Sequence, residues 1–202
     1  MVYDVQSHRL RQAGKPVPFQ ESPNKGGTVR PLYLIMHYTA GTSADGAIKW
    51  LADARAKASA HLVVDRSGSV TQLVPFNRIA WHAGKSRWNE LDGMNAFSLG
   101  IEIVNAGKLR RNERGQWVNW ASTIIPDEEV TVATHKNESS ATGWQIYTQE
   151  QLDAVIEIGL ALNDEYDFLD VLGHDDVSPG RKVDPGPAFP MTSVQSKIMG
   201  RV

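Results

Sequence analysis

Apolar runs of strand length and amphipathic stretches of helix length are mixed along this sequence, and the mixture limits the folds open to it. The run at residues 32–36 is long enough for a strand buried on both faces, and Thr148 and Gln151 have capping-box spacing. Strands are expected at residues 32–36, 61–65, 69–74, 98–105 and 168–172. Helices are expected at residues 43–56, after Thr148 and at 192–199.

The fourth expected strand alternates residue by residue. Leu99, Ile101 and Ile103 are predicted to face one side of a sheet, with Gly100 and Glu102 on the other. Because strands and helices are interspersed along the chain, the predicted fold class is α/β (mixed), with a central, mostly mixed β-sheet flanked by helices.

Composition excludes several classes of protein. The 202 residues suit one domain, residues 1–202, and the net charge of -2 gives no basic face for nucleic acid. The chain has no cysteine, so a metal would have to be held by histidines and carboxylates. Its apolar runs are too short to span a bilayer, and its N-terminus lacks the apolar core of a secretory signal. We therefore expect a chain made as a soluble cytoplasmic protein, with no membrane insertion and no evident obligate protein partner.

Two segments resist assignment to regular elements. Residues 1–29 are polar and rich in proline and glycine, so they are interpreted as an irregular N-terminal arm. Residues 107–147 hold three tryptophans among many polar residues and are expected to form an excursion within the domain, either a hairpin or a long loop facing substrate.

The most informative segment for chemistry is GHDDVSPGRKVDPGPAFP, residues 173–190. Its prolines and glycines predict an irregular, stiff, non-helical backbone. Lys182 and Asp184 lie two residues apart, so in an extended backbone their side chains leave the same face, while Arg181 and Val183 point away. This segment therefore offers a cation and a carboxylate to one point.

Histidines extend this set of polar groups. His174 lies in the same segment, and His37 follows the first buried run. With Asp184 they would leave a fourth zinc position open, as a hydrolytic site requires. The alternative is that each is an ordinary hydrogen-bonded histidine, and spacing alone does not decide between the two readings. His8 and His135 are interpreted as surface histidines.

Several ordered motifs resemble the type-2 N-acetylmuramoyl-L-alanine amidase superfamily. That group includes phage endolysins, muropeptide-recycling amidases and peptidoglycan-recognition proteins. The matching motifs are LIMHYTAG (34–41), SAHLVVDRSGSVTQLVP (59–75), WHAGKS (81–86), NAFSLGIEIVN (95–105) and the segment 173–190. The resemblance implies the fold of that superfamily. It also implies hydrolysis of the amide between the lactyl group of N-acetylmuramic acid and L-alanine of the stem peptide, with peptidoglycan or muropeptides as partners.

The resemblance also assigns roles to residues. It places one Zn2+ per chain on His37, His174 and Asp184, and it makes Glu102 and Lys182 the catalytic pair. The third ligand is an aspartate where many relatives have cysteine, in agreement with a chain that has none. Residues in or beside the motifs are expected to line the substrate groove, namely Tyr38, His61, Trp81, His82 and Asn95.

Three other classes of protein compete with this interpretation. A non-catalytic recognition module is disfavoured, because every ligand and catalytic position holds a competent residue type. A glycosidase with paired carboxylates would leave the histidines unexplained, and no G-x-S-x-G motif supports a serine hydrolase. The setting stays open between a phage endolysin that reaches the cell wall after release, a cytoplasmic recycling enzyme and a secreted antibacterial effector.

Overall fold

A five-stranded sheet forms the centre of the computed structural model, which describes residues 2–201. Its order is β16-β5-β11-β6-β7, in which the first four strands are parallel and β7 pairs antiparallel with β6. The predicted mixed sheet is therefore confirmed. The strands are β5 (Tyr33–Tyr38), β6 (Leu62–Val64), β7 (Val70–Gln72), β11 (Ser98–Ile103) and β16 (Asp170–Gly173).

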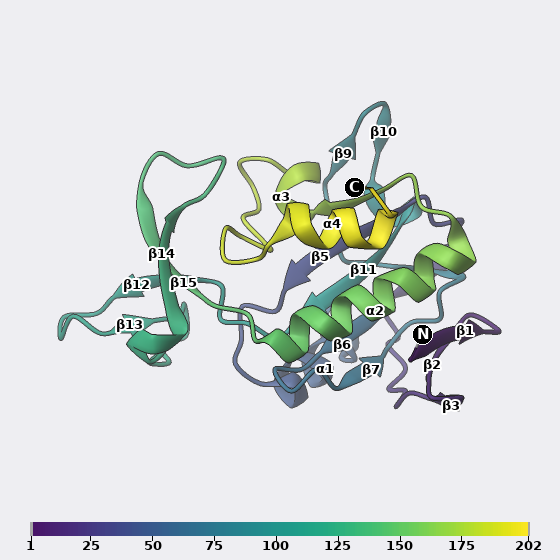
Figure 1. Ribbon diagram of the computed structural model, residues 1–202, viewed down its shortest axis with the longest axis horizontal. Helices are drawn as coiled ribbons and strands as arrows, with labels where there is room; N and C mark the ends of the chain where they lie inside the picture. The colour runs from purple at the N-terminus through teal and green to yellow at the C-terminus, as the bar shows by residue number, and fades with distance from the viewer. Residues whose placement is uncertain (1, 202) are drawn as a thin grey trace.

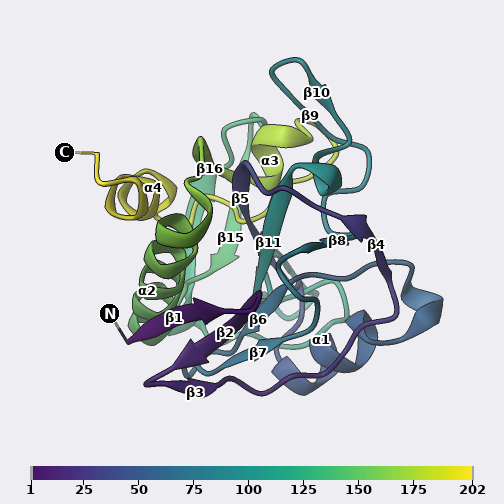
Figure 2. The same ribbon diagram turned by 90° about the vertical axis from the view of Figure 1, so that its right-hand side faces the viewer.

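Helices cover both faces of this sheet, as Figures 1 and 2 show. The helices α2 (Gln149–Tyr166) and α4 (Met191–Met199) pack together on one face, and α1 (Ala44–Leu51) lies on the other. The expected capping box of Thr148 and Gln151 is present at the start of α2. Helix α1 ends five residues earlier than expected, and a 3-10 turn at Ala54–Ala56 follows it.

The predicted alternation of β11 determines what each face of the sheet carries. Leu99, Ile101 and Ile103 are fully buried in the core beneath α2 and α4. Gly100 and Glu102 therefore face the opposite side, which they share with His37 of β5. The α2 side is thus packed with apolar side chains, whereas the other side carries the polar ones.

The N-terminal arm is not irregular, so that prediction was wrong. It forms a three-stranded antiparallel meander, which lies beside α2 (Figure 2). The turn between β1 and β2 places Ser7 and His8 at positive φ, a conformation that residues other than glycine adopt rarely, so no turn signal marked it; the next turn contains Gly14. The strands are β1 (Tyr3–Gln6), β2 (Arg9–Gln12) and β3 (Lys15–Pro16), and β4 (Lys25–Thr28) pairs further on with β8 (Arg78–Ala80).

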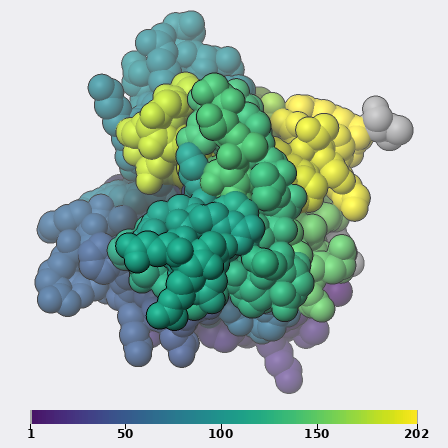
Figure 3. All heavy atoms as spheres, turned by 90° about the vertical axis from the view of Figure 1, so that its left-hand side faces the viewer, coloured from purple at the N-terminus to yellow at the C-terminus, as the bar shows by residue number. Residues whose placement is uncertain are grey.

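The excursion is a small sheet of its own, with strand order β13-β12-β15-β14. It projects from the body of the molecule in Figure 1 and forms the teal and green face of Figure 3. Trp117 and Leu109 are buried in its own apolar cluster. The strands are β12 (Lys108–Arg111), β13 (Trp117–Val118), β14 (Val130–Thr134) and β15 (Ala141–Gln145).

Two smaller features complete the fold. A short hairpin of β9 (Arg87–Trp88) and β10 (Leu91–Asp92) stands beside α3 (His174–Val177). Within residues 2–201 no helix has the length and apolar character needed to cross a membrane.

Candidate metal centre

Three neighbouring parallel strands bring polar residues to the same edge of the sheet. His37 is the second-last residue of β5, and Glu102 is its direct partner on β11. On the other side of β5, β16 ends at Gly173, and His174 begins the single turn of α3. Ligand sites of parallel sheets form at the carboxyl ends of their strands, and these residues occupy that edge.

The ring nitrogens of two histidines and one carboxylate oxygen converge at a buried point. The Nδ1 atoms of His37 and His174 lie 3.0 Å apart, and Asp184 Oδ2 is 3.0 Å from the first and 2.9 Å from the second. All three residues are buried, and their ligand atoms lie within 4.8 Å of one another. These are the three residues that the resemblance assigns to zinc.

Contacts behind the two histidines orient their Nδ1 atoms toward this point. The Nε2 atom of His174 lies 3.1 Å from the carbonyl oxygen of Ala83, so it carries the proton and donates. The Nε2 atom of His37 lies 2.9 Å from Nδ1 of His82. Each histidine thus has a partner for Nε2, which leaves the Nδ1 lone pair free for a cation.

The electrostatics of the cluster also suit a cation. Burial, followed by the nearby His174, lowers the pKa of His37 to about 4, so its imidazole is neutral at pH 7. Burial alone would raise the pKa of Asp184, but its contacts with His174 and His37 outweigh burial and lower it. Neutral imidazoles and an ionised carboxylate are the forms that bind zinc, so the residues present fit that ion.

Glu102 is half-buried, and one of its carboxylate oxygens has no protein partner. Part of the residue reaches the cavity, but Oε2 is buried and has no hydrogen bond from any described residue. Burial raises the pKa of Glu102 well above its usual value, Asp184 raises it further, and Lys182 acts against them. An unsatisfied buried oxygen is costly, so its place beside a metal cluster points to a functional group.

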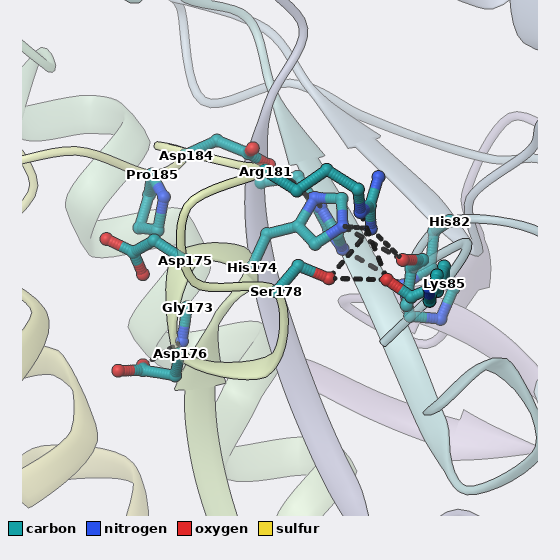
Figure 4. Close-up of polar contacts among 12 residues, drawn as sticks. His82, Lys85, Gly173, His174, Asp175, Asp176, Ser178, Arg181, Asp184 and Pro185 are labelled. Atoms are coloured by element: carbon teal, nitrogen blue, oxygen red, sulfur yellow. Dashed lines mark hydrogen bonds and ion pairs between the residues drawn. The ribbon is translucent and has the colours of Figure 1, made fainter. Parts of the chain in front are cut away.

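A cavity of about 400 Å³ opens over the cluster and is lined by Glu102, Lys182 and Asp184 among others. Arg181 and Val183 also line it, so the prediction that these two side chains point away was wrong. The Arg181 guanidinium donates to the carbonyl oxygen of Ala83 at 2.7 Å, and it lies beside the His174 ring in Figure 4. Residues 179–181 form a turn, so the backbone is not extended at Arg181, as the prediction required.

The residues expected to line a substrate groove divide into two groups. Tyr38, Trp81 and His82 line the cavity. His61 and Asn95 do not, and both make contacts within the protein. The Nε2 of His61 donates to the carbonyl oxygen of Arg78 at 2.9 Å, and Asn95 Oδ1 accepts from the backbone N–H of His82 at 3.0 Å.

His135 is buried, so its interpretation as a surface histidine was wrong. It lies in the excursion, and its Nε2 is 2.8 Å from Oδ2 of Asp175, the residue after His174. Lys136 donates to the other oxygen of Asp175 at 2.9 Å. The excursion is thereby tied to α3, a long-range contact that no local sequence pattern signals.

The class of protein follows from this arrangement. A buried His–His–Asp cluster at the carboxyl ends of parallel strands could hold a metal ion, and an unpaired carboxylate oxygen and a lysine line the adjoining cavity, a combination typical of the class of metal-dependent hydrolases. Residues 27–187 match the family of N-acetylmuramoyl-L-alanine amidases, and the chain belongs to that family.

Individual relatives agree with this assignment. The 1,6-anhydro-N-acetylmuramyl-L-alanine amidase AmpD of Escherichia coli is 30% identical over 67% of this chain and 56% of its own length. The N-acetylmuramoyl-L-alanine amidase AmiD of Escherichia coli is 27% identical over 98% of this chain and 59% of its own. The chain thus spans little more than half the length of these relatives.

A solved structure shares the fold. AMPDH3 of Pseudomonas aeruginosa, in complex with anhydromuramic pentapeptide, has a TM-score of 0.59 and 27% identity, and the match covers 83% of this chain and 59% of AMPDH3.

Proposed function

We propose that this protein hydrolyses the amide bond between the lactyl group of N-acetylmuramic acid and L-alanine of the stem peptide, with zinc held by His37, His174 and Asp184. One observation carries the proposal: Glu102, whose buried Oε2 has no hydrogen-bond partner, pairs with His37 on the neighbouring strand and lines the same cavity as His174 and Asp184. Metal-assisted hydrolysis uses a base beside the metal ion, and this arrangement supplies a base beside a metal cluster.

His37, His174 and Asp184 would hold the zinc ion, which would supply a Lewis acid and lower the pKa of a water molecule toward neutral pH. Glu102 lines the cavity, where it accepts the proton of the attacking water and returns it to the departing alanine nitrogen. Lys182 lines the same cavity and stabilises the negative charge that forms on the carbonyl oxygen. His82 and the carbonyl of Ala83 hold the two ligand imidazoles in orientation throughout.

The substrate class follows from the relatives. AmpD and AmiD are named for cleavage at the muramyl–alanine bond, and AMPDH3 binds an anhydromuramic pentapeptide. Transferred to this chain, these names support a muropeptide or peptidoglycan strand as substrate, with one Zn2+ per chain as cofactor. The cavity is lined by carboxylates and by the cationic side chains of Arg181 and Lys182, which suit a polar amide substrate rather than an apolar ligand.

The test is product analysis by mass spectrometry. Zinc-loaded protein is incubated with purified sacculi and, separately, with soluble anhydro-muropeptides, alongside Glu102→Gln and chelator-treated protein. Free stem peptides that disappear in both controls are the expected result. Sugar reducing ends would instead indicate a glycosidase, and co-sedimentation with uncut sacculi would indicate a recognition module; either outcome would refute the proposal.

The same assay separates the two settings. Faster release from sacculi supports lysis of a cell wall, as by an endolysin. Faster release from soluble anhydro-muropeptides supports recycling of wall fragments.

A further inference from the structure

A second hollow lies beside the metal-centre cavity. It has a volume of about 570 Å³ and lies between the loop that joins β5 to α1 and the tip of the excursion. Trp50 of α1 and Trp120, in the turn after β13, line it. In Figure 3 the teal atoms of the excursion lie next to the blue atoms of the segment that carries α1.

Both tryptophans expose large apolar surfaces to this hollow. Trp120 is 76% exposed and Trp50 is 57% exposed. The Trp120 ring is nevertheless held in place, because its Nε1 donates to the carbonyl oxygen of Ala40 at 2.8 Å. An exposed aromatic ring with its polar edge fixed offers a rigid apolar face, which is how proteins bind rings of a ligand at low entropic cost.

The remaining lining is uncharged. Thr39, Thr42 and Ser43 supply hydroxyl groups, and none of the residues that line the hollow carries a charge. The metal-centre cavity differs, since Arg181 and Lys182 line it together with carboxylates. Aromatic faces with hydroxyl groups suit a neutral sugar ring, whose apolar C–H face stacks while its hydroxyls form hydrogen bonds.

The two cavities are continuous. Thr39, Ala40, Ala47 and Trp50 line both of them. A ligand held with its scissile amide at the metal centre can therefore extend along the surface into the hollow. In a peptidoglycan substrate the extension is either the glycan, which is made of neutral N-acetylated sugars, or the stem peptide, which carries carboxylates. Charge complementarity assigns the stem peptide to the Arg181 and Lys182 side and the glycan to the uncharged hollow.

From these contacts we infer that the hollow between Trp50 and Trp120 is a glycan subsite, which binds the sugars attached to the muramic acid at the cleaved bond. The inference rests on the proposed function for the identity of the substrate. It makes the excursion a specificity element, because Trp120 belongs to it. The protein then prefers substrates that carry further sugars over those that end at the muramic acid.

Binding to metal-free protein tests the subsite independently of activity. The probes are the neutral tetrasaccharide of N-acetylglucosamine and the free tripeptide L-Ala-γ-D-Glu-L-Lys, titrated against the whole chelator-treated chain. Trp50→Ala and Trp120→Ala should each weaken tetrasaccharide binding about tenfold or more, a typical loss for a buried aromatic anchor. Tripeptide binding should stay unchanged in Trp120→Ala, because Trp120 does not line the metal-centre cavity. Val132→Ala removes an equally exposed apolar side chain of the excursion and serves as the matched control.

Kinetics then separate this inference from the proposed function. Trp120 lines the hollow and not the metal-centre cavity, so the zinc-loaded Trp120→Ala variant should lose kcat/KM on a glycan-extended muropeptide and keep it on N-acetylmuramyl-peptide. A wild-type protein that cleaves neither substrate refutes the proposed function, while the tetrasaccharide titration still reports on the hollow. No binding of the tetrasaccharide to wild type, or unchanged affinity in both tryptophan variants with melting temperatures like that of wild type, overturns the glycan subsite.

Discussion

The Nε2 atom of His37 lies 2.9 Å from the Nδ1 atom of His82, and this contact continues into the body of the protein. The Nε2 atom of His82 is 3.4 Å from Ser98 Oγ, which donates in turn to the carbonyl oxygen of Met94 at 2.6 Å. A carbonyl oxygen only accepts, so the Ser98 hydroxyl donates to Met94 and its oxygen accepts from the N–H at Nε2 of His82. His82 Nδ1 is therefore unprotonated and accepts from the N–H at Nε2 of His37. The Nδ1 atom of His37 is then unprotonated and faces His174 and Asp184.

We expect His82 to control zinc affinity by this orientation. His82→Leu removes the acceptor for His37 and should weaken zinc binding about 10–100-fold, the range found when the hydrogen-bond partner of a ligand histidine is lost. His82→Asn places an amide oxygen near the position of Nδ1 and should recover most of the affinity. Competition with a chromophoric chelator measures both. Equal losses in the two variants would show that His82 contributes only packing.

Zinc should stabilise the folded protein through the three ligands. At a free concentration 100 times its dissociation constant, zinc would add about 2.7 kcal/mol, which corresponds to roughly 5–10 °C in melting temperature for a chain of this size. Asp184→Ala should abolish this increase, since it removes one of the converging atoms. His8 is not part of the cluster and forms a hydrogen bond with Tyr166 instead, so His8→Ala should retain the zinc-dependent increase in melting temperature. A zinc-dependent shift that survives in Asp184→Ala would place the ion elsewhere.

Glu102 is expected to cost stability while it serves the reaction. Burial raises its folded pKa above the unfolded value near 4.5, so ionisation favours the unfolded state as pH rises from that value to the folded pKa. Below pH 4 the group is protonated in both states and the penalty vanishes. Glu102→Gln should therefore stabilise metal-free protein by roughly 1–2 kcal/mol at pH 7 and little at pH 4. Denaturant unfolding at the two pH values measures the difference, and a gain that is larger at pH 4 would contradict this account.

Much of the metal centre could be predicted from the sequence. His37 follows a buried apolar run, and the alternation of the strand that carries Glu102 predicted that Glu102 faces away from Leu99 and Ile101. That His37 shares this face depends on the pairing of the two strands, which the alternation does not show. His174 and Asp184 came from motif resemblance, since the distance between them in sequence does not define a metal site. The capping box at Thr148 joins residues only three positions apart, so it could be predicted from the sequence.

The missed features depend on tertiary contacts. His135 reaches Asp175 across 40 residues, and Arg181 reaches the carbonyl oxygen of Ala83 across 98. The sequence pattern within either segment does not indicate which distant residue it contacts. The N-terminal meander was missed for a different reason, because its first turn uses Ser7 and His8 at positive φ, where sequence rules expect glycine or asparagine.

Gly100 provides the last prediction, because its missing side chain makes room for His82. A Cβ atom built on Gly100 would lie 2.5 Å from Cγ and Nδ1 of the His82 ring. Gly100→Ala should therefore cost about 1–3 kcal/mol through overpacking and also weaken zinc binding, since the displaced ring loses its contact with His37. Gly27→Ala is the matched control: it lies in strand β4, and its Cβ would meet nothing within 4 Å. Unfolding and chelator competition on both variants decide the matter. If Gly100→Ala keeps wild-type zinc affinity, the position of the His82 ring does not govern the metal centre.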